Sequence, residues 1–172
     1  GVAPSEFEQI GVDTFSIISD WYHYAILSLL ETPDSKLDPR WIARRLGISL
    51  AEAAGAVERL KRLDLIEKRA GRWGQKGKRI RVDNVEASAA ARKFHRQLLT
   101  KALESLENDP KPVRDFEGIT LAFDPREMPY AIERLNSYAR ELAVELQKRG
   151  RPSEVYELAV QFFPVSRRGD EK

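Results

Sequence analysis

Residues 38–81 read DPRWIARRLGISLAEAAGAVERLKRLDLIEKRAGRWGQKGKRIR, and this stretch decides the fold. Asp38 and Pro39 are typical of the first positions of a helix, so we expect one short helix to begin here. Further on, Ser49 and Glu52 have the spacing of a capping box, which predicts the start of a second helix. Two helices joined by a turn of three residues predict a helix-turn-helix.

The second half of this stretch predicts a β-hairpin. We expect strands at residues 65–69 and 78–82, separated by a basic tip at residues 70–77 that contains three glycines. Apolar residues repeat at helical spacing over residues 14–31 and predict one further helix that packs across the pair. The sequence therefore predicts a winged helix-turn-helix domain over residues 14–83.

A second domain is expected after the wing, so the predicted fold class is α+β, a winged helix-turn-helix domain followed by a helix-strand-helix-strand C-terminal domain. Its elements are a helix at 85–106, a strand at 116–123, a helix at 124–149 and a strand at 153–164. Around the two domains, at 14–83 and 84–166, we expect an acidic lead-in at 1–13 and a charged tail at 167–172. Two strands alone make a marginal sheet. A second copy of the chain could extend that sheet into a homodimer, or a pocket beside it could bind a small-molecule effector, whose identity the sequence leaves open.

Composition narrows the classes of protein that fit the chain. The 172 residues are 42% hydrophobic and 33% charged, with no run of about 20 apolar residues that could cross a membrane. The chain has no Cys and two His, so we expect no disulfide, no metal site, no cofactor and no catalytic centre, and we predict a cytoplasmic protein that is not an enzyme. Because the only Met is Met128, we also expect a further N-terminal part to precede residue 1.

Positive charge is concentrated where a polyanion would meet the winged domain. Residues 14–81 carry 14 Lys and Arg against 8 Asp and Glu, a net charge of +6, and nine of these cations lie in residues 61–81. The predicted partner is double-stranded DNA, bound mainly by the wing, with the amino terminus of the second helix positioned on the backbone. The candidate DNA-binding residues are Arg44, Arg45, Ser49, Arg59, Arg62, Lys68, Arg69, Arg72, Lys76, Lys78 and Arg79.

The second helix is poorly equipped to recognise bases. Its outward residues near the start are small or acidic, whereas base edges are usually recognised by Arg, Lys, Asn or Gln. We therefore keep two interpretations: a DNA-binding transcriptional regulator whose wing supplies the affinity, and a winged-helix module or scaffold that binds another protein without binding DNA. Reversing the charges of Arg72, Lys76 and Lys78 is expected to abolish only the first activity.

Short motifs spread along the chain resemble a bacterial family of conserved hypothetical proteins that is catalogued as a domain of unknown function and is abundant in predatory bacteria. The motifs are Trp21-Tyr22-His23 with Ala25-Ile26, Asp38-Pro39-Arg40-Trp41-Ile42-Ala43, Leu60 through Leu65-Ile66, Arg114-Asp115-Phe116, Val155-Tyr156 and Phe162-Phe163-Pro164. The resemblance covers nearly the whole chain. It implies a winged-helix transcriptional regulator, often with a further N-terminal region, and it supplies no catalytic residues.

Overall fold

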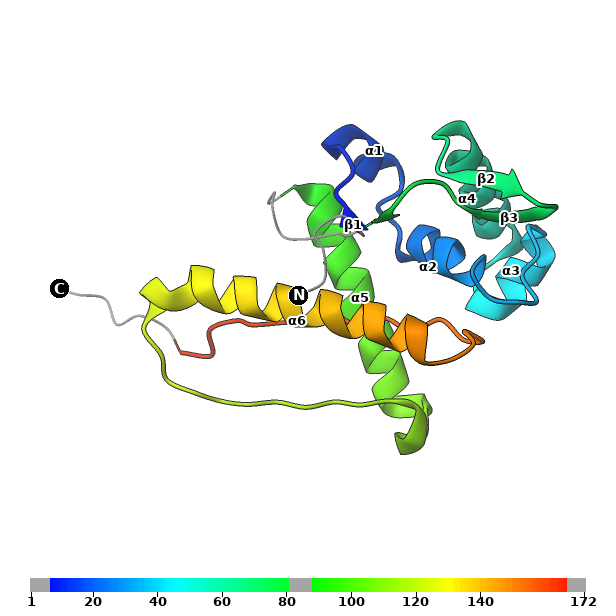
Figure 1. The fold of residues 1–172 in the computed structure, drawn as a ribbon. Coiled ribbons are helices and arrows are strands. Elements are labelled where there is room, and N and C mark those ends of the chain that lie inside the picture. Colours follow the sequence, from blue (N-terminus) through cyan, green and yellow to red (C-terminus); the bar gives the residue numbers. More distant parts are fainter. Residues whose placement is uncertain (1–6, 81–87, 167–172) are drawn as a thin grey trace.

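The structure is a computed structural model that describes residues 7–80 and 88–166. It has an α+β fold in which helices predominate and the strands of the described residues form small two-stranded sheets (Figure 1). The elements are β1 Phe7–Glu8, α1 Val12–Ile17, α2 Trp21–Leu29, α3 Pro39–Leu46, α4 Leu50–Arg62, β2 Ile66–Arg69, β3 Arg72–Gln75, β4 Arg79–Ile80, α5 Ala89–Asn108, the 3-10 helices η2 Lys111–Val113 and η3 Pro125–Glu127, and α6 Met128–Arg149.

The two helices predicted from residues 38–81 are confirmed, together with their caps. The Asp38 side chain accepts a hydrogen bond from the backbone N–H of Arg40 at 2.8 Å and starts α3. Gly47 ends α3 with φ +65°, a conformation that glycine adopts without steric cost. Ser49 and Glu52 form the reciprocal capping box of α4, with bonds of 3.1 and 2.8 Å. Local sequence signals therefore fix both ends of the turn between α3 and α4.

The hairpin that follows α4 is shorter and tighter than predicted. Strand β2 pairs antiparallel with β3, and Arg69 lies opposite Arg72, so the turn consists of Ala70 and Gly71 alone. Both turn residues have positive φ, +48° and +80°, as a type I′ turn requires. The predicted tip at 70–77 was therefore wrong, because residues 72–75 are the second strand of the hairpin.

The predicted strand at residues 78–82 was also wrong as a partner of β2. Within the described residues it is the short strand β4, which pairs parallel with β1, Phe7 opposite Arg79 and Glu8 opposite Ile80. Residues 81 and 82 lie outside the described ranges. Part of the predicted acidic lead-in thus belongs to a sheet.

The helix predicted over residues 14–31 is two helices, α1 and α2, so this prediction was wrong. The chain turns at residues 18–20, and Asp20 becomes the N-cap of α2. The Gln97 side chain of α5 accepts a hydrogen bond from the backbone N–H of Trp21 at 2.9 Å and donates one to Asp20 at 2.8 Å. A residue 76 positions away therefore accepts a hydrogen bond from a backbone N–H group that the first turn of α2 leaves without a partner inside the helix.

A hydrophobic core lies between α2, α3, α4 and β2. Ile26, Ile42 and Leu60 contribute fully buried side chains from the three helices, and Ile66 of β2 is 4% exposed. Burying one such side chain contributes about 1.5–3 kcal/mol. This core sets the angle at which α4 and the hairpin β2–β3 face solvent.

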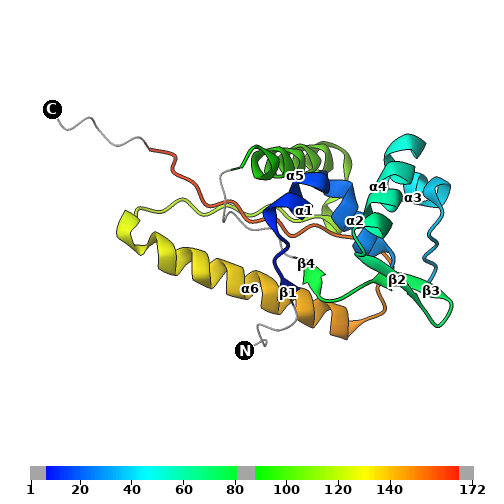
Figure 2. The same ribbon diagram turned by 90° about the horizontal axis from the view of Figure 1, so that it is seen from above.

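The C-terminal part confirms the predicted helices but lacks the predicted strands. Helix α5 begins at Ala89, with the Ser88 side chain as its cap, and residues 85–87 of the predicted helix lie outside the described ranges. The helix predicted at 124–149 is the short 3-10 helix η3 followed by α6, which ends at Arg149. Residues 116–123 and 153–164 run as drawn-out chain beside α6, and neither segment forms a sheet with another described segment (Figure 2). Alternating apolar residues predicted strands there, but a strand also needs a hydrogen-bonding neighbour, which the described part of a single chain does not supply.

No helix within residues 7–80 or 88–166 combines the length and apolar character that crossing a membrane requires.

Candidate nucleic-acid interface

The first turn of α4 is exposed and offers apolar contact rather than charge. Leu50 is 51% exposed, and Ala51 beside it also faces solvent. The Glu52 carboxylate accepts the Ser49 backbone N–H, and its hydrogen bonds with the Ser49 side chain and backbone lower its pKa. The carboxylate is thereby held against the start of its own helix instead of projecting outward.

Arg59 of α4 is partly buried and forms a hydrogen bond with a buried histidine. Its Nε donates to His23 Nε2 at 2.9 Å, and His23 Nδ1 lies 3.0 Å from the Asp20 carbonyl oxygen. Because Nε2 accepts, Nδ1 must carry the proton that is donated to Asp20, which fixes the neutral tautomer. The Arg59 guanidinium lies over Gly55, where an added Cβ would be 3.2 Å from it. The Arg59 side chain therefore packs along α4, between His23 and Gly55.

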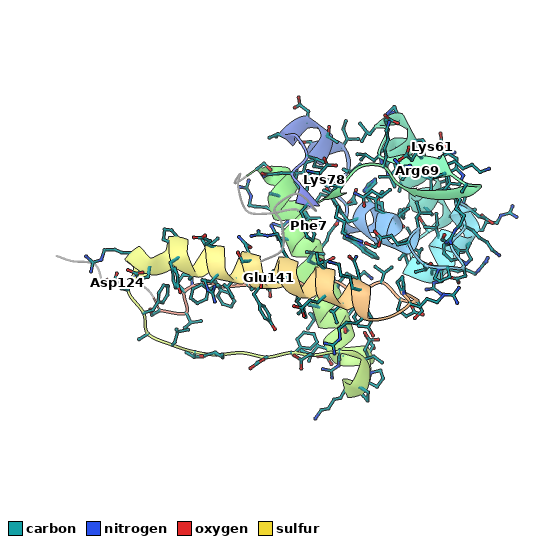
Figure 3. All side chains as sticks on the ribbon, viewed as in Figure 1. Phe7, Lys61, Arg69, Lys78, Asp124 and Glu141 are labelled. Carbon is teal, nitrogen blue, oxygen red and sulfur yellow. The ribbon has the colours of Figure 1, made fainter. Side chains whose placement is uncertain are left out.

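Four exposed cations lie at the carboxyl end of α4 and on the adjacent strand β2, and we call Lys61, Arg62, Lys68 and Arg69 the basic cluster. Lys61 lies over the Trp73 ring, 5.8 Å from its centroid, and pairs with Glu58 at 3.4 Å. Lys68 is opposite Trp73 in the hairpin, so Lys61 and Lys68 share one face. Arg69 adjoins the turn; it pairs with Glu67 and remains 77% exposed. Figure 3 shows Lys61 and Arg69 at the same end of the molecule.

Three of the predicted wing cations have structural partners instead. Arg72 donates to the Thr32 carbonyl oxygen at 2.8 Å and to Ser35 Oγ at 3.3 Å, which anchors β3 to the turn after α2. Arg79 pairs with Glu31 at 3.3 Å. Lys76 pairs with Asp64 at the end of α4, and hydrogen bonding to that carboxylate raises the Lys76 pKa. These three side chains hold the hairpin region on the helices.

The two predicted arginines of α3 differ sharply from each other. Arg45 donates to the Ser153 carbonyl oxygen at 2.9 Å, pairs with Glu154 at 3.2 Å and lies near Asp34 at 3.9 Å, so it joins α3 to the C-terminal segment. Arg44 is exposed and has no ion pair or hydrogen bond from its side chain to any other described residue. Of these two arginines, Arg44 is therefore the one whose side chain is free to contact an external anion.

Across the ranges that the structure describes, the predicted residues thus fall into two groups. The side chains of Arg44, Arg62, Lys68 and Lys78 have no ion pair or hydrogen bond with another described residue, and Arg69 is largely exposed. Ser49, Arg45, Arg59, Arg72, Lys76 and Arg79 are engaged in the fold. The basic cluster lies at one end of α4, and Ser49 lies at the other.

Lys78 and Arg79 line a shallow hollow of about 460 Å³ between the end of α2 and residues 74–79. Leu30, Glu31, Gly74, Gln75 and Gly77 complete its lining. In the described part of the chain, no three His, Asp or Glu residues are placed to hold a metal ion.

His23 is the residue whose role the sequence did not indicate. A histidine in an aromatic helix gave no sign of a partner 36 residues further on, and only the packing of α2 against α4 brings Arg59 to it. The same is true of Asp20, which binds Gln97 and Lys93 of α5, the latter at 2.7 Å. Neither contact has a signature in local spacing.

The chain belongs to the family described as "Domain of unknown function (DUF4423)", which matches residues 3–165. The resemblance to a family of unknown function is thereby confirmed. The match runs from before β1 to the segment after α6, so helices α3 and α4 and the C-terminal helices all lie within it. No curated protein and no solved structure matches the chain.

Proposed function

We propose that this protein is a DNA-binding transcriptional regulator of the winged-helix class that acts in the cytoplasm. In this proposal α4 enters the major groove, and the hairpin β2–β3 is the wing that contacts the phosphate backbone. The observation that carries it is the basic cluster, which lies directly beside a helix-turn-helix.

The exposed start of α4 supports groove entry without strong base recognition. Leu50 and Ala51 can contact thymine methyl groups, and their backbone N–H groups, which the capping box of Ser49 and Glu52 does not use, suit a phosphate. Glu52 is turned back on Ser49 and would not oppose the backbone directly. This arrangement favours modest sequence preference, with most of the affinity coming from phosphate contacts.

The basic cluster supplies those contacts. Arg62 and Lys68 have no ion pair with another described residue. Lys61 pairs with the exposed Glu58, and Arg69, which is 77% exposed, pairs with Glu67, which is 27% exposed; pairs with so much solvent contact are weak in water. A polyanion that binds Lys61 and Arg69 would therefore break their ion pairs at little cost in free energy. The type I′ turn keeps the tip short, so Arg69 approaches the backbone on a rigid ribbon.

A second candidate function is a winged-helix module that binds another protein. The observation that favours it is Leu50, a large apolar side chain that is 51% exposed in the first turn of α4, on a helix that also carries the exposed acidic residue Glu58. Such a partner would present an apolar pocket with a basic rim. Its binding would depend on Leu50 and would survive loss of the basic cluster.

The first experiment measures fluorescence anisotropy of a mixed-sequence duplex with the protein over a salt series. We expect micromolar or tighter binding that weakens steeply as salt rises. The variant Arg62→Gln/Lys68→Gln/Arg69→Gln removes three cations without touching Arg72 or Arg79, which the fold needs. We expect at least about tenfold weaker binding and a log–log salt slope reduced by about 2 to 3.

The matched control is Arg96→Gln/Arg134→Gln/Lys148→Gln, which removes the same charge from exposed positions on α5 and α6. It should bind DNA nearly as well as the unmodified protein. Equal losses in both triple variants would indicate a general charge effect and contradict the proposed interface. Absence of binding by the folded protein at low salt would favour the protein-binding module.

A further inference from the structure

The C-terminal part of the chain exposes an unusual amount of apolar surface. Of 21 large hydrophobic side chains that are exposed among the described residues, 18 lie between Leu99 and Val165. They form a stripe on α5, a stripe on α6 and the alternating positions of the two drawn-out segments, which run antiparallel to α6 (Figures 2 and 3). Ile119, Tyr138 and Tyr156 are 78%, 66% and 70% exposed.

The size of this surface is that of an interface. A large aromatic side chain offers about 150–250 Å², and exposed fractions of 36–79% over the 18 side chains leave on the order of 1,500 Å². The largest apolar patch on a typical monomer is about 300–600 Å². A stable protein–protein interface covers about 800 Å² on each partner. The exposed apolar area of the C-terminal part is therefore larger than a monomeric protein usually exposes to solvent.

The same region lacks a closed core of its own. Among residues 99–166, Val144 is the one buried hydrophobic side chain. Phe123 and Phe162 stack at 5.1 Å and join the two drawn-out segments, but the backbone of those segments has no sheet partner among the described residues. The helices and segments of this region have apolar faces, and no described element of residues 99–166 covers those faces.

Charge indicates what kind of molecule can cover the surface. Residues 88–166 contain 12 Lys and Arg and 12 Asp and Glu, a net charge of zero. A second copy of the same region therefore meets no net electrostatic repulsion, whereas a nucleic acid would find no excess of positive charge. A twofold arrangement also lets an unpaired segment of one copy form a two-stranded pair with a segment of the other copy, since both copies offer the same backbone groups.

We propose that a second copy of this chain covers the C-terminal apolar surface and that the protein is a homodimer built through α6 and the segments 116–123 and 153–164. This inference goes beyond DNA binding and does not depend on it. In the dimer, the apolar surfaces of the two C-terminal parts would pack against each other and form one shared hydrophobic core.

Sedimentation equilibrium of the full chain over a concentration series tests the proposal. We expect twice the 19.7 kDa mass of one chain at micromolar concentration. The variant Ile119→Asp/Tyr156→Asp places charges at positions that are exposed in one chain, so the monomer should still fold. We expect its dissociation constant to rise at least tenfold, with helical circular dichroism retained. Val12→Asp, an exposed apolar position on α1, is the matched control and should leave the dimer intact.

Cross-linking gives a second readout, because the chain has no cysteine. A single Cys introduced as Ile119→Cys can react with a bifunctional thiol reagent only between two chains. We expect a dimer band for Ile119→Cys and none for Val12→Cys. A monomeric mass at 50 μM or above, or a dimer that Ile119→Asp/Tyr156→Asp and Val12→Asp weaken equally, would overturn the proposal.

Discussion

His23 and Arg59 show how a buried polar pair can shape a helix surface. His23 is fully buried, and its two ring nitrogens bind the Asp20 carbonyl oxygen and Arg59 Nε. Burial lowers the pKa of His23 to about 4, with the positive charge of Arg59 as a further cause, although the hydrogen bond to Asp20 acts in the opposite direction. The ring is therefore neutral in the folded protein at neutral pH and accepts from a cation that would otherwise project from α4.

This pair makes the stability of the protein depend on pH. The unfolded chain protonates His23 near pH 6.5 and the folded chain near pH 4, so the unfolded state binds more protons between these values. The contribution of His23 is fully present above about pH 6.5 and is lost as the pH falls to about 4. The shift corresponds to about 3 kcal/mol. Urea unfolding at pH 7.5 and pH 4.5 measures the loss.

The variant His23→Gln serves as the control, because its amide can still bond to both neighbours but does not titrate. Acid also removes the contribution of Asp20 to the free energy of unfolding. Burial raises the pKa of Asp20, but hydrogen bonds from Lys93 and Gln97 outweigh this effect and lower it. That loss is common to both proteins. An equal drop in unfolding free energy for His23→Gln and the unmodified protein would refute the role assigned to His23.

At the scale of elements, local signals predicted more than long-range ones did. The caps at Asp38 and Ser49 and the helix at α6 follow from neighbouring residues, and they were predicted correctly. The break before α2 depends on Gln97, and the pairing of β1 with β4 joins residues more than 70 positions apart. Glycines at 71, 74 and 77 suggested a long loop, although only the first of them lies in the turn.

Within the candidate site, sequence reasoning identified the residue types but not their partners. Lys68 and Arg69 lie where a wing cation was expected, at the hairpin and facing solvent. Arg72 and Arg79 have the same chemistry, yet their partners Thr32 and Glu31 come from the end of α2. Such pairings follow from packing between distant elements, for which one sequence contains no local signal.

The hairpin turn carries a residue that is not suited to its backbone conformation. Ala70 has φ +48°, which costs a residue with a Cβ about 1 kcal/mol or more. We expect Ala70→Gly to raise the unfolding free energy by about 0.5–1 kcal/mol. Thermal and urea unfolding would measure this gain.

The same substitution within α4 gives a control of opposite sign. Ala54→Gly places glycine in a helix interior and should destabilise the protein by about 1 kcal/mol. If Ala70→Gly also lowered stability, the strain assigned to the turn would not exist.

At the scale of the whole molecule, contacts of Arg45 join the segment after α6 to helix α3. Arg45 of α3 holds the backbone and side chain of Ser153–Glu154, and Val155 packs against the core of the helix-turn-helix. The C-terminal segment is thus held at its beginning, while the exposed apolar residues from Tyr156 onward remain uncovered. This attachment orients the proposed dimer surface relative to α4.

Removing this attachment should loosen the segment without unfolding the protein. Exposed ion pairs contribute about 0.2–1 kcal/mol, so Arg45→Met should change the thermal midpoint little. Hydrogen exchange of residues 151–160, read by mass spectrometry, should become faster by a few-fold. Arg44→Met is the adjacent control, since Arg44 is exposed and has no ion pair or side-chain hydrogen bond among the described residues. Equal exchange in the two variants would show that Arg45 does not hold the segment.

The parallel pairing of β1 with β4 has a mechanical consequence. The chain enters the helix-turn-helix region at Glu8 and leaves it at Arg79, and these two strands lie side by side. A pull on the chain before Phe7 and after Ile80 would slide the two strands in opposite directions, which loads their hydrogen bonds together rather than one at a time. Everything between them, from α1 to β3, lies outside the line of tension. The β1–β4 pair would therefore bear the applied force, and the helices between these strands would experience none until the β1–β4 hydrogen bonds break.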